Sequence, residues 1–144
     1  MTRKKKIILS ALAVIILSIS GILYYFWQRN QKTEKVVAWV EKNGSVEYRS
    51  NVWVDKLPKS IQSYIGKAVV KVNLSDSDVK DLKPLLDLPE LESLDLSLTE
   101  IEDMDTLVKL TNLKVLNLMY AEITTSNLMR LRESLPDCAI IIKD

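Results

Sequence analysis

A repeat of 22 residues dominates the second half of the sequence. The segments beginning at Val69, Leu91 and Leu113 align with one another, and each continues with three further apolar residues at helix-like spacing. A unit of this length cannot bury its apolar face alone, so consecutive units must stack into a shared core. The repeat therefore predicts parallel strands at equivalent positions of successive units. The 21 aligned apolar positions are Val69, Val72, Leu74, Val79, Leu82, Leu85, Leu88, Leu91, Leu94, Leu96, Ile101, Met104, Leu107, Leu110, Leu113, Leu116, Leu118, Ile123, Leu128, Leu131 and Leu135.

The third unit differs from the first two at its end. It is longer by a few residues, and the spacing of Leu128, Leu131 and Leu135 predicts an α-helix. The run that follows, from Cys138 to Ile142, predicts a final edge strand, which the charged residues after it protect from pairing with another sheet. We therefore predict a domain over residues 68–144, with units starting at 69, 91 and 113 and a C-terminal cap strand.

Residues 68–142 resemble bacterial leucine-rich-repeat proteins with 22-residue, internalin-type units, and the ending Leu-Pro-Asp-Cys-x-Ile is similar to the C-terminal signature of short proteins of this class. Residues 36–67 resemble the flanking region of such proteins. The resemblance implies an α/β leucine-rich-repeat solenoid, with short helices on the convex side of a parallel sheet, that recognises proteins through its sheet face. The sequence departs from the family where most repeats place Asn: Ser77 and Thr99 can substitute through their hydroxyl groups, whereas Ala121 cannot.

Residues 7–27 form an uncharged run in which 17 of the 21 residues are aliphatic or aromatic. A helix of this length spans about 31 Å, which matches the hydrocarbon core of a bilayer. The run ends in four aromatic residues followed by Gln28 and Arg29, as is typical of a membrane interface. These features predict one transmembrane helix.

The distribution of basic residues predicts the orientation of this helix. Arg3 and three lysines lie in residues 1–6, a basic tip that we expect in the cytoplasm, with the C-terminal domain outside the cell membrane. The alternative is a signal peptide cleaved near Ser20, which would give a secreted protein. The apolar run continues past that point to Trp27, which favours an uncleaved anchor.

Residues 28–35 are polar and are interpreted as a tether, and residues 36–67 as an N-terminal αβα cap. The cap is expected to hold a short helix closed by a left-handed Gly44, a strand within 45–54, and a helix from Leu57-Pro58 to Gly66. We expect the cap to cover the first edge of the repeat sheet. Its tryptophans, Trp39 and Trp53, are expected to fill a small core, with ligand stacking as the alternative.

The residues between the apolar strand positions should form the exposed face of the sheet. Just beyond the strands, Asp76, Leu98 and Tyr120 occupy one equivalent position, and Tyr is favoured at interaction hot spots. The alternative is that Leu98 and Tyr120 pack on each other across neighbouring units. The predicted partner-binding residues are Asn73, Asp95, Asn117, Leu98, Met119 and Tyr120.

Residues 69–112 are acidic, with 11 Asp and Glu against four Lys. Such a cluster can attract a basic partner or bind Ca²⁺. The acids fall in turns and at helix starts, where Asp caps backbone N–H groups, so we interpret them as structural and predict no metal or other cofactor. The part of the chain after residue 27 has no basic stripe, which disfavours nucleic-acid binding.

The sequence lacks His and has a single Cys, Cys138. These absences exclude His-dependent nucleophiles, His-ligated zinc and an intrachain disulfide, and we predict that the protein is not an enzyme. The leading hypothesis is a membrane-anchored interaction module that binds a protein partner through its sheet face. The alternative is a scaffolding envelope protein that self-associates through its transmembrane helix or its edge strands.

Overall fold

The structure, a computed structural model, describes residues 3–49, 55–59, 62 and 68–143, with side chains from residue 10 onward. The chain divides into two compact units. One unit comprises residues 1–31 and 52–66, and the other comprises residues 32–51 and 67–144. The described residues give a mixed α/β structure with one long N-terminal helix and a five-stranded sheet.

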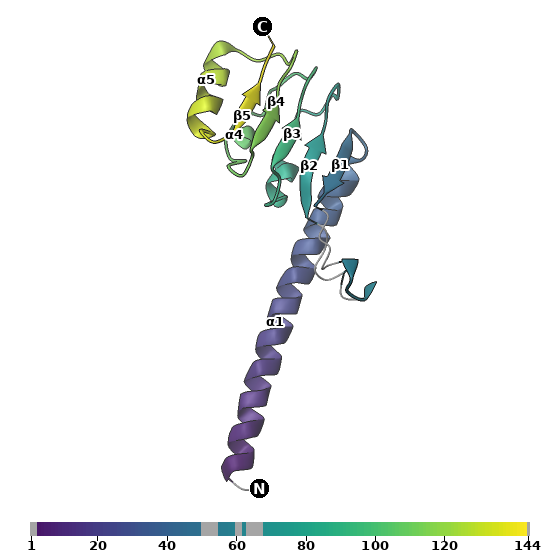
Figure 1. Cartoon of the computed structure of the whole chain (residues 1–144), viewed down its shortest axis with the longest axis vertical. Coiled ribbons are helices and arrows are strands. Elements are labelled where there is room, and N and C mark those ends of the chain that lie inside the picture. The colour runs from purple at the N-terminus through teal and green to yellow at the C-terminus, as the bar shows by residue number, and fades with distance from the viewer. Residues whose placement is uncertain (1–2, 50–54, 60–61, 63–67, 144) are drawn as a thin grey trace. The chain divides into compact units, whose positions relative to one another are not determined.

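The N-terminal helix, α1, runs without interruption from Arg3 to Val40 (Figure 1). Residues 28–35, interpreted from the sequence as a tether, are therefore helical. The reason is local, because no Pro or Gly lies between Gly21 and Asn43 to interrupt the hydrogen-bond ladder. The amides of Asn43 and Gly44 then donate to the carbonyl of Val40, at 2.9 and 2.7 Å, and close the helix.

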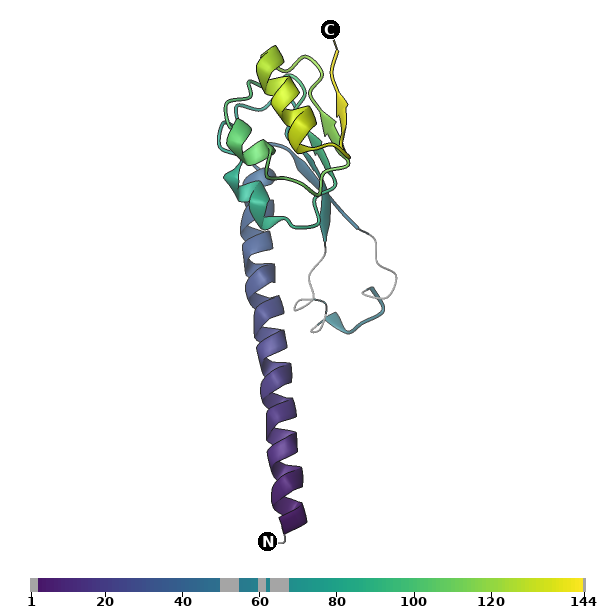
Figure 2. The same ribbon diagram turned by 90° about the vertical axis from the view of Figure 1, so that its left-hand side faces the viewer.

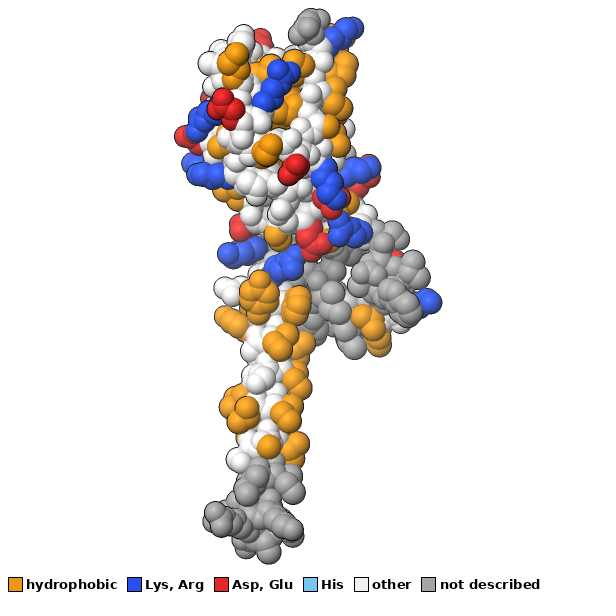
Figure 3. Space-filling view, turned by 60° about the vertical axis from the view of Figure 1, so that its left-hand side comes forward, with side chains coloured by type: hydrophobic (Ala, Val, Ile, Leu, Met, Phe, Trp, Pro, Cys, Tyr) orange, Lys and Arg blue, Asp and Glu red, His pale blue; other side chains and the backbone are white. Residues whose placement is uncertain are grey.

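The side chains of α1 between residues 10 and 27 are almost all exposed, and Figure 3 shows this stretch as hydrophobic or uncharged, without Lys, Arg, Asp or Glu. Two serines of this stretch donate hydrogen bonds back to the helix, Ser18 to Val14 O (2.8 Å) and Ser20 to Leu17 O (2.9 Å). Within the described residues, α1 is long and apolar enough to cross a membrane, a property that membrane spans and signal sequences share.

The sheet has the order β1-β2-β3-β4-β5 (Figure 1). Its first strand, β1, pairs antiparallel with β2, whereas the other pairs are parallel. The expected strand at 45–54 is observed as Ser45–Tyr48, and Trp53 and most of the helix expected before Gly66 lie outside the described residues. The strand bounds are β1 Ser45–Tyr48, β2 Val69–Asn73, β3 Ser93–Asp95, β4 Val115–Asn117 and β5 Ala139–Ile141.

The strands β2, β3 and β4 pair in the register that the sequence repeat predicts. Val72 lies opposite Leu94, which lies opposite Leu116, so each step across the sheet is one 22-residue unit. A short helix follows each of these strands: η1 (Lys83–Asp87, a 3₁₀ helix), α4 (Met104–Leu107) and α5 (Thr125–Ser134). Figure 2 shows these helices on one side of the sheet. The predicted third helix and final strand are confirmed as α5 and β5.

The core lies between the sheet and these helices. Of the 21 aligned apolar positions, 18 are buried, and Val79, Ile123 and Leu128 are half-buried. Val36 and Val40, in the last turns of α1, belong to the same core, and Trp39 packs against it. The equal spacing of apolar residues along the chain therefore produces one continuous core in this unit.

Two hydroxyl groups hold the turns after the strands. Ser77 Oγ donates to Leu74 O at 2.7 Å, and the buried Thr99 Oγ1 donates to Leu96 O at 2.6 Å. Ala121 occupies the equivalent position and has no such donor, so this turn is held by its backbone, with Ala121 N donating to Leu118 O at 3.1 Å. The hydrogen bonds predicted for the hydroxyl groups of Ser77 and Thr99 are therefore observed.

Gly44 has a different role from the one expected. Its φ does not lie in the left-handed region, and a Cβ atom built on it would stand 1.8 Å from Asn73 O and 2.9 Å from Asn73 C. Gly44 is required by the close approach of the chain before β1 to the end of β2, not by a left-handed helix cap.

Candidate functional site

Three of the predicted binding residues lie side by side at the ends of neighbouring parallel strands. Asn73, Asp95 and Asn117 are the last residues of β2, β3 and β4, and the strand register places them opposite one another. Asn117 Nδ2 donates to Asp95 Oδ2 at 2.9 Å. The structure thus brings these three residues together in one row across the sheet.

The same three side chains also fold the turns that follow their strands. Asn73 Oδ1 accepts from Ser75 N (2.8 Å), and Asn117 Oδ1 accepts from Met119 N (3.2 Å). Asp95 Oδ1 accepts from both the amide and the hydroxyl of Ser97, at 2.9 and 2.6 Å. These are short local turns in which a side chain replaces a backbone acceptor. Each of the three residues therefore stabilises its own turn, in addition to any contact that it makes with a partner.

The carboxyl group of Asp95 is held in its ionised form. Partial burial acts to raise its pKa, but the hydrogen bonds from Ser97 and Asn117 outweigh burial and lower the pKa below its usual value. Asp95 therefore places a negative charge between Asn73 and Asn117, and its Oδ1 accepts from both the amide and the hydroxyl of Ser97.

The next residues along form a row of left-handed backbone. Asp76, Leu98 and Tyr120 have φ values of 54°, 59° and 59°. The backbone ladder extends to the first two of these residues, because Asp76 N donates to Ser97 O (2.9 Å) and Leu98 N donates to Met119 O (3.0 Å). A left-handed conformation is unfavourable for a Leu or a Tyr, and the turn imposes it at the same point of each unit.

The apolar members of this row face solvent. Leu98 is 57% exposed and Tyr120 is 56% exposed, while Met119 is half-buried. Tyr120 contacts Lys143, two residues after the end of β5: Lys143 Nζ donates to the Tyr120 hydroxyl at 2.9 Å and lies 5.3 Å from the ring centroid. More than half of the surface of Leu98 and of Tyr120 thus stays exposed, and packing of these two side chains on each other accounts for at most the remainder.

The acidic residues after the strands have mainly structural contacts. Asp103 accepts from Thr106 N at the start of α4 and from Leu82 N in the preceding unit, both at 3.1 Å, and Asp81 accepts from Lys83 N at 3.0 Å. Among the described residues, no three His, Cys, Asp or Glu side chains converge to hold a metal ion. A shallow hollow beside Leu98 is lined by Asp76, Ser77, Asp78, Lys80, Leu98 and Glu100.

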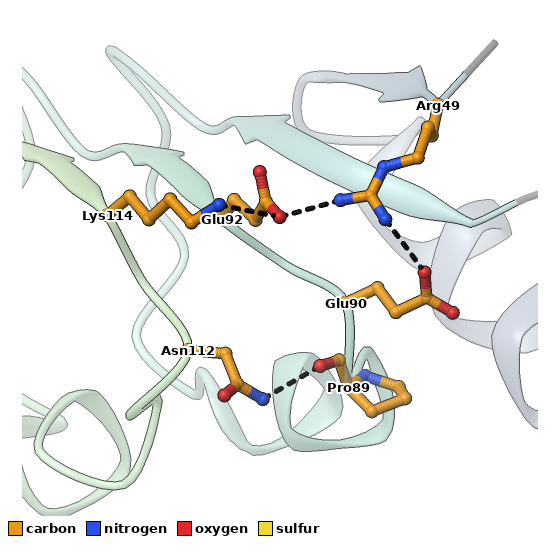
Figure 4. A network of polar contacts seen from close by, with 6 residues as sticks. All are labelled: Arg49, Pro89, Glu90, Glu92, Asn112 and Lys114. Atoms are coloured by element: carbon orange, nitrogen blue, oxygen red, sulfur yellow. Dashed lines mark hydrogen bonds and ion pairs between the residues drawn. The ribbon is translucent and has the colours of Figure 1, made fainter.

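A charged network that the sequence analysis missed crosses the amino ends of the strands (Figure 4). Glu92 Oε1 lies 2.6 Å from Arg49 Nη2 and 3.0 Å from Lys114 Nζ, and Arg49 also pairs with Glu90 at 3.4 Å. The ammonium of Lys114 is the main cause that lowers the pKa of Glu92, with Arg49 adding to it against a smaller effect of burial.

Only part of this network could have been predicted from the sequence. Glu92 and Lys114 are 22 residues apart, so the repeat places them on neighbouring strands. Arg49 follows β1, whose antiparallel pairing with β2 has no counterpart in the repeat. Lys80 and Glu102, also 22 residues apart, form another such ion pair.

Comparison with protein families and with curated proteins identified no relative of this chain. No protein-family model matches the chain, and no curated protein is a significant match to it.

Proposed function

We propose that residues 68–143 form a short leucine-rich-repeat solenoid. The support is the agreement between the sequence repeat and the pairing of β2, β3 and β4, in which one unit separates equivalent residues. The buried leucines recur at the same positions of each unit, and so do the left-handed residues of the turns. These regularities are what stacked units of one kind produce.

The proposed function of this domain is binding of a protein partner through the face that carries the six predicted residues. One observation carries this proposal: Leu98 and Tyr120 hold large, exposed apolar side chains on left-handed backbone at adjacent turns. Backbone strain of this kind concentrates at functional sites, and Tyr is enriched among residues that dominate binding energy. Binding of this kind needs no catalytic group, which agrees with a sequence that lacks His.

The proposal also covers how the protein is placed in a membrane. α1 would anchor the protein, with residues 1–6 in the cytoplasm and the sheet-bearing unit outside. The uncharged stretch within α1 and the basic residues before it support this arrangement. Treating intact and permeabilised cells with protease tests it: we expect the sheet-bearing unit to be cleaved in both. Protection in intact cells would overturn the orientation, and a mature chain that begins near Ser20 would overturn the anchor.

Photo-crosslinking of the full chain in the cells that produce it tests the binding face. A photoreactive amino acid would replace Leu98, and in a matched control it would replace Met129, which is 59% exposed on α5. We expect adducts with another polypeptide from position 98 and not from position 129, and we expect Tyr120→Ala to abolish them. Equal adducts from both positions, or none from position 98, would refute the proposed face.

A further inference from the structure

The row of left-handed residues continues across the end of the sheet to Lys143. Hydrogen bonds connect each member to the next turn: Asp76 N to Ser97 O, Leu98 N to Met119 O, and Lys143 Nζ to Tyr120 Oη. The row therefore reads Asp76, Leu98, Tyr120, Lys143 across the four neighbouring chain segments that follow β2 to β5. It has an acid at one end, a base at the other, and two apolar side chains between them.

Within the described part of the chain, no side chain of opposite charge neutralises either end of this row. No described side chain forms an ion pair with Asp76 or with Lys143, although both residues are exposed. Many other charges of this unit are paired, including Lys71 with Glu47, Lys114 with Glu92, and Arg130 with Asp105. The row thus offers one free carboxylate and one ammonium that contacts only the Tyr120 ring and hydroxyl among the described residues.

If two copies of this row face each other in opposite directions, acidic residues meet basic residues and apolar residues meet apolar residues. A two-fold axis between Leu98 and Tyr120 places Asp76 of one copy against Lys143 of the other, and Leu98 against Tyr120, twice each. This is the requirement for an isologous contact, in which residue i meets residue j and j meets i. We propose that this row binds a second copy of the same chain. The inference rests on the proposed function, because it names the partner of the same face.

The row alone predicts weak association. Four segments at a spacing of about 4.8 Å cover about 14 Å, which is shorter than the width of a standard interface. Two copies held in one membrane by α1 would meet at a much higher effective concentration than two free domains. Self-association is therefore expected for the full chain in a bilayer.

Charge reversal in the full chain tests the arrangement, with energy transfer between donor-labelled and acceptor-labelled copies in phosphatidylcholine vesicles as the readout. Asp76→Lys and Lys143→Asp should each weaken self-association by about tenfold, because each creates two like-charge contacts across the axis. A mixture of the two single variants should restore it, since a mixed pair recovers both oppositely charged contacts. The double variant should also self-associate.

Two further variants guard against indirect effects. Asp76→Asn, which tolerates left-handed backbone, should weaken association by a smaller factor than Asp76→Lys. Lys109→Asp makes the same charge change as Lys143→Asp at an exposed position outside the row, and it should leave association unchanged.

The outcomes separate this inference from the proposed function. Absence of energy transfer in the wild-type chain, or a mixture that associates no better than its components, would overturn the second copy as partner. If position 98 still crosslinked to a different polypeptide in a Tyr120-dependent manner, the binding face itself would stand. If position 98 gave no adduct and no row variant altered energy transfer, both proposals would fall.

Discussion

Gly44 lies so close to the backbone of Asn73 that a Cβ atom at position 44 would stand 1.8 Å from the Asn73 carbonyl oxygen. The atoms it would meet are backbone atoms at the end of β2, which cannot move aside as a flexible side chain could. We therefore predict that Gly44→Ala destabilises the sheet-bearing unit by about 3 kcal/mol, at the upper end of the usual cost of overpacking. Urea unfolding of the full chain in detergent micelles, followed by tryptophan fluorescence, would measure this.

Gly21 provides the matched control. A Cβ atom there would meet nothing within 4 Å, and the residue lies in the interior of α1. Gly21→Ala should leave the unfolding of the sheet-bearing unit unchanged, because it alters only helix propensity within α1. A Gly44→Ala chain as stable as the wild type would show that the two segments are not in this contact.

Left-handed backbone at Leu98 gives a second prediction. Glycine adopts this conformation freely, whereas Leu loses about 1–2 kcal/mol there. Part of that gain is offset by the greater freedom of Gly in the unfolded chain, so we expect Leu98→Gly to stabilise the protein by about 0.5–1 kcal/mol. Leu98→Ala, which keeps a Cβ atom, should give no such gain. Thermal unfolding of the two variants would decide between them, and equal stabilities would contradict the strain.

The features that the sequence predicted most completely are those that follow from its 22-residue period. The period identified the buried leucines and the parallel register, because stacking requires equivalent residues to be neighbours. It gave no signal for the left-handed Leu98 and Tyr120, since neither residue type favours that conformation. Arg49 reaches the charged network through an antiparallel strand outside the repeat, so no spacing rule could place it beside Glu92.

The same limit applies to the candidate site. Asn73, Asp95 and Asn117 were predicted together because they are one period apart, and the structure brings them together. Lys143 was missed as a neighbour of Tyr120 because it follows the longer third unit, where the period no longer holds. Residues 28–35 were interpreted as a tether from their polarity, which describes exposure and not backbone conformation.

The hydroxyl groups of the turns give a third prediction. Thr99 is buried, and its hydroxyl donates to Leu96 O, so Thr99→Val keeps the shape and loses one hydrogen bond. We expect a cost of about 1 kcal/mol. The converse change, Ala121→Ser, places a hydroxyl where the third turn lacks one, and it should stabilise the protein by up to about 1 kcal/mol. Both values follow from urea unfolding, and loss of stability in Ala121→Ser would contradict the equivalence of the three turns.

Asp103 gives a prediction about pH. Burial acts to raise its pKa, but the hydrogen bonds from Thr106 and Leu82 outweigh burial and lower the pKa below its usual value. A carboxyl group whose pKa is lower in the folded than in the unfolded state stabilises the fold above its unfolded pKa of about 3.9. That contribution is lost as the pH falls below about 4 and through the lower folded pKa.

Asp103→Asn removes the titrating carboxylate, and the Asn side chain keeps only one oxygen that can accept from Thr106 N or Leu82 N. At pH 7 we expect the variant to be less stable than the wild type by about 1–2 kcal/mol, which combines a weakened helix cap with a lost hydrogen bond between units. The difference should shrink as the pH approaches 3, because protonated Asp103 in the wild type loses the same interactions. Asp105→Asn is the control, since Asp105 lies in an exposed ion pair with Arg130 that contributes little to stability. Urea unfolding at pH 7, 5, 4 and 3 would measure the stability of both variants. If the difference between Asp103→Asn and the wild type stayed constant across this range, the Asp103 carboxylate would not stabilise the fold through the amides of Thr106 and Leu82.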